Sequence, residues 1–175
     1  QRVILVLDAS GSMWGKIKGK AKMDIAKEVV GKVISTWKPE DDLGLVVYGH
    51  REKGSCTDIE TVWPPKPLNA GEYMSPIKAL SPKGKTPMTQ AVRQAAEALK
   101  YTEQKGTVIL VSDGLETCDA DPCAAAAELV GRGARSRRGF HDLRLRAGLC
   151  HHCERDAAAG GGAAARHRHR GVGRA

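Results

Sequence analysis

The sequence predicts an α/β fold of the doubly wound, three-layer (Rossmann-like) kind, with a mainly parallel sheet and an antiparallel hairpin at one edge. Two observations support this prediction. The runs Arg2–Leu7 and Thr107–Ser112 are continuously apolar and rich in β-branched residues, as strands buried on both faces are. Between them, apolar residues recur every three or four positions over Lys20–Trp37, which is the period of an amphipathic helix. Strands and helices that alternate in this way form a sheet covered on both faces.

The antiparallel edge is predicted from the segment that follows this helix. The helix ends near Pro39, and strands are expected over Leu43–Tyr48 and Ile59–Trp63, the second stopped by two prolines. About ten residues, 49–58, separate the two strands. They are too few for a helical crossover, so the two strands should form an antiparallel hairpin.

The second half of the chain continues the alternation. A short helix is expected over Ser75–Leu80, and a long one from Pro87 or Met88 to Tyr101. After the strand at 107–112, Asp121-Pro122 is a good start signal for a helix over Cys123–Val130. In a sheet of this kind, ligands bind beyond the carboxyl ends of the parallel strands.

The composition changes after about residue 130. Residues 131–175 hold 11 Arg, no Lys and three acids, which accounts for the whole formal net charge of +8. They are rich in Gly, Ala and His and carry too few large apolar residues to offset their chain entropy. We therefore expect a partial domain of residues 1–130 whose C-terminal strands are missing, followed by a basic Arg/Gly/Ala-rich tail of residues 131–175. A frameshift in a GC-rich gene and a native disordered arm both account for such a tail.

Short oxygen-bearing side chains gather where the expected ligand site lies. They come from three segments, and they are Asp8, Ser10 and Ser12 after the first strand, Thr86 before the second long helix, and Asp113 after the strand at 107–112. Two carboxylates and three hydroxyls, with no His or Cys among them, suit a hard cation such as Mg²⁺, Mn²⁺ or Ca²⁺. The sequence therefore predicts a divalent-metal site at this edge of the sheet.

These residues resemble the metal-ion-dependent adhesion site (MIDAS) of von Willebrand factor A (VWA) domains. The D-x-S-x-S signature of that family is present as Asp8, Ser10 and Ser12, its separate threonine matches Thr86, and its later aspartate matches Asp113. The resemblance covers residues 1 to about 130 and fails beyond them.

The resemblance implies a module that binds rather than an enzyme. The serines and the threonine would contact the metal, the two aspartates would hold it directly or through water, and one position would stay open for an Asp or Glu carboxylate of a partner protein. Two acids only neutralise a divalent ion, so a third negative ligand is attracted. Four residues near the site are candidates for the partner surface: Trp14, His50, Arg51 and Glu116. A packed loop aromatic is the alternative role for Trp14.

Three cysteines lie near the same edge. Cys56 falls in the hairpin loop, Cys118 follows the third metal segment, and Cys123 stands at a helix start. A disulfide Cys56–Cys118 or Cys118–Cys123 would tie loops near the site and indicate an oxidising compartment, whereas free buried thiols are the alternative.

The expected location is periplasmic or extracellular. The segments Tyr48–Arg51 and Gly114–Cys118 resemble exported bacterial members of the family. The residues begin at Gln1 rather than Met, so a signal peptide would lie outside them. No apolar run is long enough to span a membrane, and no nucleic-acid partner is expected, because residues 1–130 are neutral overall.

Two other functions fit parts of the pattern. An accessory subunit of an ATP-driven complex, such as a metal chelatase, would use a similar A domain beside an ATPase on another chain. A haloacid-dehalogenase-like phosphohydrolase would use Asp8 as its nucleophile, but that family needs an acid two residues later, where this chain has Ser10.

Overall fold

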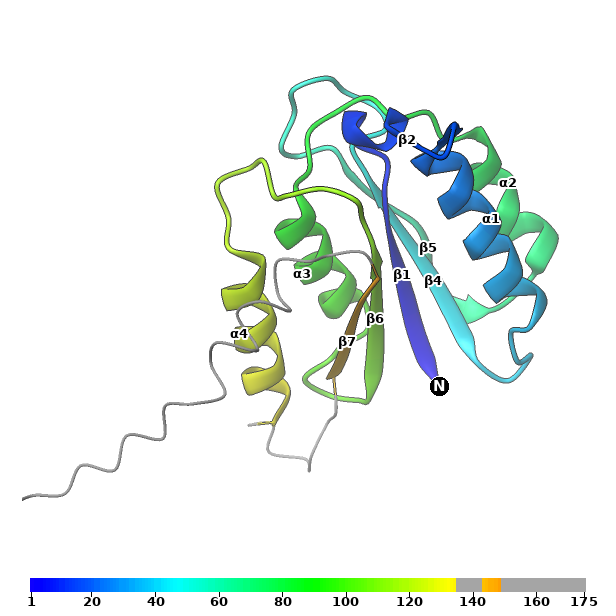
Figure 1. Cartoon of the computed structure of the whole chain (residues 1–175). Coiled ribbons are helices and arrows are strands. Elements are labelled where there is room, and N and C mark those ends of the chain that lie inside the picture. The colour runs from blue at the N-terminus through cyan, green and yellow to red at the C-terminus, as the bar shows by residue number, and fades with distance from the viewer. Residues whose placement is uncertain (135–142, 149–175) are drawn as a thin grey trace, which may run out of the picture.

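The sheet is mixed and mainly parallel, as the sequence predicts. The computed structural model describes residues 1–134 and 143–148. In these residues it has a five-stranded sheet of order β5-β4-β1-β6-β7 (Figure 1). The strands are β1 (Arg2–Asp8), β4 (Asp42–Tyr48), β5 (Ile59–Pro67), β6 (Gly106–Val111) and β7 (Leu143–Gly148).

Strand β1 is the centre of the sheet. It pairs in parallel with β4 on one side and with β6 on the other. Strand β5 runs antiparallel to β4, which confirms the predicted hairpin, and β7 runs parallel to β6. All four parallel strands therefore end at the same edge, where the loops gather at the top of Figure 1.

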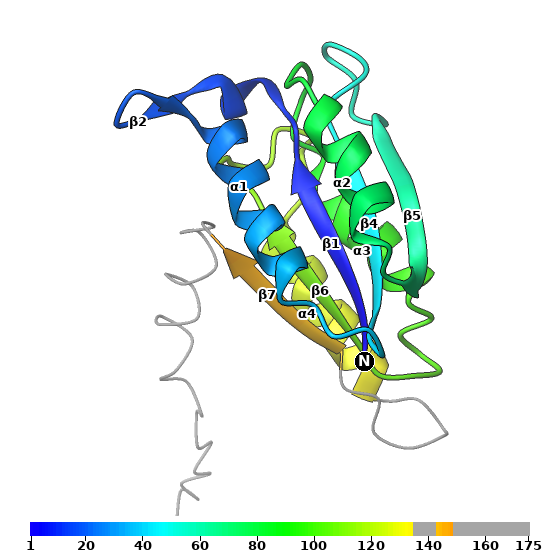
Figure 2. The same ribbon diagram turned by 90° about the vertical axis from the view of Figure 1, so that its right-hand side faces the viewer.

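Helices cover the sheet on both faces. Helices α1 and α2 lie on one face and α3 and α4 on the other (Figures 1 and 2). Their bounds are α1 (Lys22–Ser35), α2 (Ala70–Ala79), α3 (Met88–Ala98) and α4 (Pro122–Ala134). A short 3₁₀ helix, η1 (Gly11–Trp14), and a small hairpin of β2 (Lys16–Ile17) and β3 (Lys20–Ala21) precede α1.

The continuous apolar run of β1 is explained by two hydrophobic clusters. Val3, Leu5 and Leu7 belong to the cluster that includes residues of α1 and α2. Ile4 and Val6 belong to the cluster with α3, and all five are buried. A strand with helices on both sides needs apolar residues at every position rather than at alternate ones.

Helix α2 begins earlier than the sequence predicts. Ser75–Leu80 was the expected helix, whereas the structure starts it at Ala70, capped by the Asn69 side chain, which accepts from the backbone N–H of Glu72 at 3.3 Å. Pro76 lies inside the helix. A proline is most often found in a first turn, so this one misplaces the predicted start.

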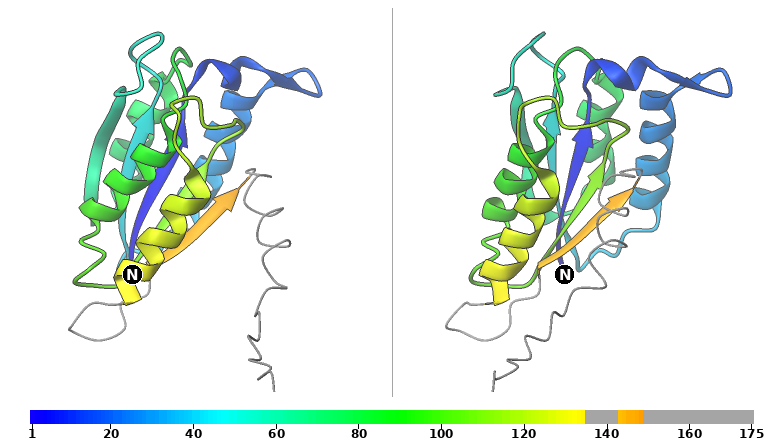
Figure 3. Two further views of the ribbon diagram at one scale, coloured as in Figure 1. Left: turned by 90° about the vertical axis from the view of Figure 1, so that its left-hand side faces the viewer. Right: turned by 60° about the vertical axis from the view of Figure 1, so that its left-hand side comes forward.

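The prediction that the sheet stops at Thr107–Ser112 is corrected by one strand. Strand β7 pairs with the whole of β6, so the outer edge of β6 is not open (Figure 3). The six residues of β7 alternate leucine or alanine with arginine or glycine, and such alternation is typical of strands. The arginine-rich composition of the surrounding segment hides that pattern. The division into a domain of residues 1–130 and a tail of 131–175 stays a prediction, because residues 135–142 and 149–175 lie outside the described part.

Across residues 1–134 and 143–148, no helix is both long and apolar enough to cross a membrane.

Candidate metal centre

The three predicted segments meet at the carboxyl edge of the parallel strands. Asp8 ends β1, Thr86 lies in the loop before α3, and Asp113 follows β6. The first two segments are joined through the backbone, because Ser10 and Gly84 form a parallel bridge and the Gly11 N–H donates to the Gly84 carbonyl at 3.0 Å. The loops are therefore part of one hydrogen-bonded framework.

Two glycines allow the loop backbones to approach. Gly49, after β4, has φ of +72°, and a Cβ there would lie 2.6 Å from the Lys85 carbonyl and 2.9 Å from the Ser10 Cα. A Cβ on Gly84 would lie 2.5 Å from the Glu52 carbonyl. Any side chain at either position would push the loops apart.

Asp8 is buried and held by neutral donors. Its side chain accepts from the Ser10 backbone N–H at 2.7 Å and from the Ser112 hydroxyl at 2.6 Å. Burial raises the pKa of the Asp8 carboxyl above its ordinary value, and these hydrogen bonds offset only part of that effect. A bound cation would favour the ionised form of this carboxyl.

The serines connect the first segment to the third. The hydroxyls of Ser10 and Ser12 lie 3.1 Å apart, and the Ser12 hydroxyl donates to Asp113 Oδ1 at 2.7 Å. The second oxygen of Asp113 accepts from the ammonium of Lys22, the first residue of α1, at 2.5 Å. Lys22 was not predicted as a site residue, because its position in the chain does not indicate a partner in the loop that follows β6.

Thr86 is hydrogen-bonded to the loop that follows Asp113. The Thr86 backbone N–H donates to the Thr117 hydroxyl at 2.8 Å, and the Thr117 N–H donates to the Thr86 carbonyl at 3.2 Å. A Cβ placed on Gly114 would lie 3.3 Å from the Ser12 hydroxyl and 3.9 Å from the Thr86 hydroxyl. Both hydroxyls thus lie within 4 Å of the place that a side chain at 114 would occupy.

The donor set fits a hard divalent cation. Asp8, Ser10, Ser12, Thr86 and Asp113 offer only oxygen, at one end of the sheet. No group of three or more His, Cys, Asp or Glu side chains that could hold a metal occurs in residues 1–134 and 143–148.

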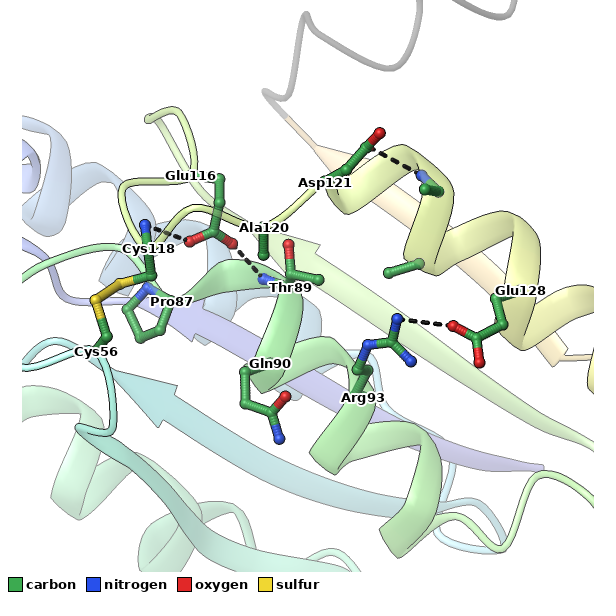
Figure 4. A pocket seen from close by; sticks show the side chains of 12 residues that line it. Cys56, Pro87, Thr89, Gln90, Arg93, Glu116, Cys118, Ala120, Asp121 and Glu128 are labelled. Carbon is green, nitrogen blue, oxygen red and sulfur yellow. Dashed lines mark hydrogen bonds and ion pairs between the residues drawn. A yellow bond between two sulfur atoms is a disulfide. The ribbon is translucent and has the colours of Figure 1, made fainter.

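A disulfide holds the loop that follows Asp113. Cys118 bonds to Cys56, 62 residues earlier in the chain, which confirms one of the two predicted pairs and excludes Cys118–Cys123. Beside it, the Glu116 carboxylate accepts from the N–H of Thr89 at 2.7 Å and from the N–H of Cys118 at 2.9 Å (Figure 4). Because Thr89 is in the first turn of α3, Glu116 acts as a cap supplied by another loop. These groups border a cavity of about 400 Å³ between α3 and α4.

The other candidate partner residues differ in exposure. Trp14 is 58% exposed, and its indole N–H donates to the Pro82 carbonyl at 2.9 Å. His50 Nε2 lies 2.9 Å from a carboxylate oxygen of Glu60, and its side chain is mostly buried. Trp14 is thus one of the large apolar side chains near the site that stay accessible, together with Leu115, which is 64% exposed.

Arg51 is tied to a buried acid. Its Nε and its backbone N–H each donate to Asp58 at 2.7 Å, and the Glu52 N–H donates at 3.0 Å. Burial alone would raise the pKa of Asp58, but these hydrogen bonds outweigh it and hold the pKa below its ordinary value of 3.8. Asp58 therefore fixes the loop between β4 and β5 that carries Cys56.

Residues 3–116 match the von Willebrand factor type A domain. The chain belongs to this family. Curated relatives include two uncharacterized proteins of Bacillus subtilis, YwmC and YwmD, which are 31% and 33% identical over 136 and 137 residues. Each alignment covers 73% of this chain, which spans about 60% of the length of either relative. The inter-alpha-trypsin inhibitor heavy chain H2 of Sus scrofa is 27% identical over 122 residues, 65% of this chain and 12% of that protein.

Solved structures share this VWA fold. A von Willebrand factor type A protein from Catenulispora acidiphila has a TM-score of 0.60 at 20% identity and covers 83% of this chain and 32% of its own. The PilB minor pilin of Streptococcus sanguinis has a TM-score of 0.57 at 12% identity, with 90% of this chain and 59% of its own covered. The vWF domain of the type V pili tip protein Mfa5 from Porphyromonas gingivalis has a TM-score of 0.51 at 20% identity. The match covers 65% of this chain and 38% of that chain. At these identities the likeness establishes the fold alone.

Proposed function

We propose that this chain is a divalent-metal-dependent protein-binding module, in which Mg²⁺, or Mn²⁺ or Ca²⁺ in its place, coordinates a carboxylate of a partner protein. The observation that carries the proposal is the meeting of three loops with two carboxylates, three hydroxyls and the space beside Gly114. Asp8, Ser10, Ser12, Thr86 and Asp113 would hold the ion.

The charge of the site favours an acidic partner. Asp8 and Asp113 together balance a divalent ion, and the neutral hydroxyls add no charge. A carboxylate from outside would then be the strongest available ligand for an open coordination position. Trp14, exposed at the end of η1 two residues after Ser12, gives the partner an apolar contact beside the metal.

Binding is favoured over phosphoester hydrolysis. A hydrolase that used Asp8 as nucleophile would need a general acid nearby, and the residue two positions on is Ser10. The Asp8 carboxylate also accepts hydrogen bonds from Ser10 and Ser112 in the interior, where it is fully buried. A buried, doubly hydrogen-bonded carboxylate suits ligation better than attack.

An extracytoplasmic location agrees with the crosslink and with the structural neighbours. The Cys56–Cys118 disulfide persists in oxidising compartments. By their titles, two neighbours are a type V pili tip protein and a minor pilin. We infer an adhesive or assembly role at the cell surface or in the periplasm for this domain.

Thermal unfolding with and without metal tests the proposal. Purified chain in EDTA should unfold at a lower temperature than in Mn²⁺ or Mg²⁺, since a ligand at 100 times its dissociation constant adds about 2.7 kcal/mol to the folded state. Asp8→Ala should remove the metal-dependent increase. Glu40→Ala is the matched control, because Glu40 is an exposed acid at the opposite end of the sheet, before β4. An unfolding temperature that is indifferent to metal in the parent would refute the proposal.

A further inference from the structure

We propose that Lys22 is a tethered counter-cation of the candidate metal centre. Its ammonium neutralises Asp113 when no metal is bound, and a divalent ion must displace it to use that carboxylate. Lys22 thereby sets the metal affinity of the site. The inference rests on the proposed metal-binding function and deepens it.

Both oxygens of the Asp113 carboxylate already have donors. Oδ1 accepts from the Ser12 hydroxyl at 2.7 Å and Oδ2 from Lys22 Nζ at 2.5 Å. The Asp113 side chain is only 7% exposed, so water does little to screen the pair. A carboxylate oxygen has two lone pairs, so a metal that takes one oxygen of Asp113 would share that oxygen with one of these two donors or replace it.

Electrostatic repulsion selects Lys22 as the donor that leaves. The Ser12 hydroxyl is neutral and can turn its lone pairs toward a cation. An ammonium and a divalent ion that shared one partly buried carboxylate would repel each other strongly, because the effective dielectric constant there is well below that of water. The bond from Lys22 is therefore the one that metal binding breaks.

The backbone of Lys22 is fixed while its side chain has room to leave. The Lys22 N–H donates to the Gly15 carbonyl at 2.8 Å. The Lys22 side chain lies close to Gly15, because a Cβ placed on that glycine would be 3.2 Å from the Lys22 Cε. The stem also borders a mostly apolar groove of about 240 Å³, lined in part by Ile25, Val29 and Val111. The Lys22 side chain is 29% exposed, so its ammonium can move from Asp113 into water without a change in α1.

The arrangement makes the metal-free site pre-assembled. The Lys22–Asp113 ion pair joins the start of α1 to the loop after β6, and the Ser12–Asp113 hydrogen bond joins the same loop to the segment after β1. The loops then keep their places without an ion, at the cost of weaker metal binding.

Mn²⁺ affinity of charge-altered variants tests the inference. Free Mn²⁺ is measured by electron paramagnetic resonance for the parent, Lys22→Met, Lys22→Arg and Lys20→Met. Methionine keeps the length and apolar stem of lysine, and we expect Lys22→Met to bind Mn²⁺ about tenfold more tightly or better, since one nearby charge shifts such equilibria by at least that factor. Lys22→Arg should bind like the parent. Lys20→Met is the control, because Lys20 pairs with Glu28 on the exposed surface.

A second measurement needs no substitution. In the parent chain, the ¹⁵N signal of the Lys22 ammonium should report a hydrogen-bonded group in EDTA and a solvated one after Mg²⁺ is added. An ammonium signal that stays hydrogen-bonded at saturating Mg²⁺ would overturn the inference.

The outcomes separate this inference from the proposed function. If the parent binds Mn²⁺ and Lys22→Met binds it no more tightly, Lys22 does not compete with metal, and only the inference fails. If neither chain binds Mn²⁺, the metal-binding function fails and the inference falls with it.

Discussion

The two segments that supply the acids of the candidate site are held in different ways. Asp8 ends the central strand, is fully buried, and accepts hydrogen bonds only from neutral groups, Ser10 and Ser112. Asp113 stands in a loop beyond β6 and is held by a charge, Lys22, and by a hydroxyl, Ser12. Among the residues that the structure describes, no cation pairs with the Asp8 carboxylate, whereas the Asp113 carboxylate is paired with Lys22.

The loop after β6 also depends on contacts that can be removed one at a time. It is joined to the rest of the site by the Cys56–Cys118 disulfide, the Glu116 cap on α3 and two hydrogen bonds between Thr86 and Thr117. The segment after β1 continues a central strand and cannot be loosened without disrupting the sheet. Perturbations should therefore loosen the loop after β6 before they affect the segment after β1.

Removal of the crosslink should have the largest effect. A chain carrying both Cys56→Ser and Cys118→Ser is expected to lose about 2–4 kcal/mol of unfolding free energy, because the disulfide closes a long loop in the unfolded chain. Hydrogen exchange should rise at residues 113–118 and not at residues 9–12. Equal increases in both segments would contradict the difference between them.

The loop that carries Cys56 should depend on Asp58 for its stability. Asp58→Asn is expected to cost about 1–2 kcal/mol, because the buried carboxylate receives charged and backbone donors from Arg51 and Glu52. Urea unfolding of the two chains at pH 7 measures the difference. Glu52→Gln is the control, because it replaces an exposed acid of the same loop by a neutral amide. It should change the free energy of unfolding little.

The difference in stability between the parent and Asp58→Asn should become smaller at low pH. The pKa of Asp58 is lower in the folded chain than its ordinary value of 3.8, so its stabilising effect is complete well above 3.8 and is lost as the pH falls through the folded pKa. The gap in unfolding temperature between the parent and Asp58→Asn should therefore shrink as the pH is lowered from 7 toward 3. A gap that is constant or grows over that range would show that the Asp58 ion pair with Arg51 does not stabilise the fold.

The Glu116 cap should contribute less. Glu116→Gln is expected to lower the unfolding free energy by about 1 kcal/mol, because a negative charge is lost at the N-terminus of α3 and one of two backbone donors loses its acceptor. Differential scanning calorimetry of the variant in EDTA measures the loss. Glu97→Gln, near the opposite end of α3, is the matched control and should not be destabilised through the helix dipole.

Neutralising either acid of the candidate site should change the free energy of unfolding only slightly, and the two variants should differ. In EDTA, Asp113→Asn is expected to cost about 1 kcal/mol, because the partly exposed Lys22 loses its charged partner. Asp8→Asn should be neutral or slightly stabilising, since burial disfavours the ionised Asp8 carboxyl. Urea unfolding at pH 7 compares the two variants, and equal losses in both would show that the carboxylates are held alike.

Much of the fold and the acid set could be predicted from the sequence, because both depend on local patterns. The continuous apolar run of β1 follows from its two buried faces, and the short connection at 49–58 leaves only an antiparallel hairpin. Asp8 and Asp113 directly follow strands that proved to be parallel neighbours, so strand ends alone place them at one edge.

The parts that the sequence did not predict depend on distant partners or on masked patterns. Lys22 and Asp113 are 91 positions apart, and nothing in the local sequence around Lys22 indicates that it pairs with the loop after β6. Strand β7 has the same length as β6, but arginines interrupt its apolar residues, so it does not stand out in an arginine-rich segment. The choice between Cys56–Cys118 and Cys118–Cys123 also needed the positions of the loops, because both spacings permit a bond.

The location of Mn²⁺ in a crystal of this chain tests the central claim most directly. Crystals soaked in saturating Mn²⁺ should show an anomalous difference peak among the hydroxyls of Ser10, Ser12 and Thr86, beside Asp8 and Asp113, and the peak should vanish after an EDTA wash. The absence of a peak at that place, or a peak only elsewhere on the domain, would contradict the account.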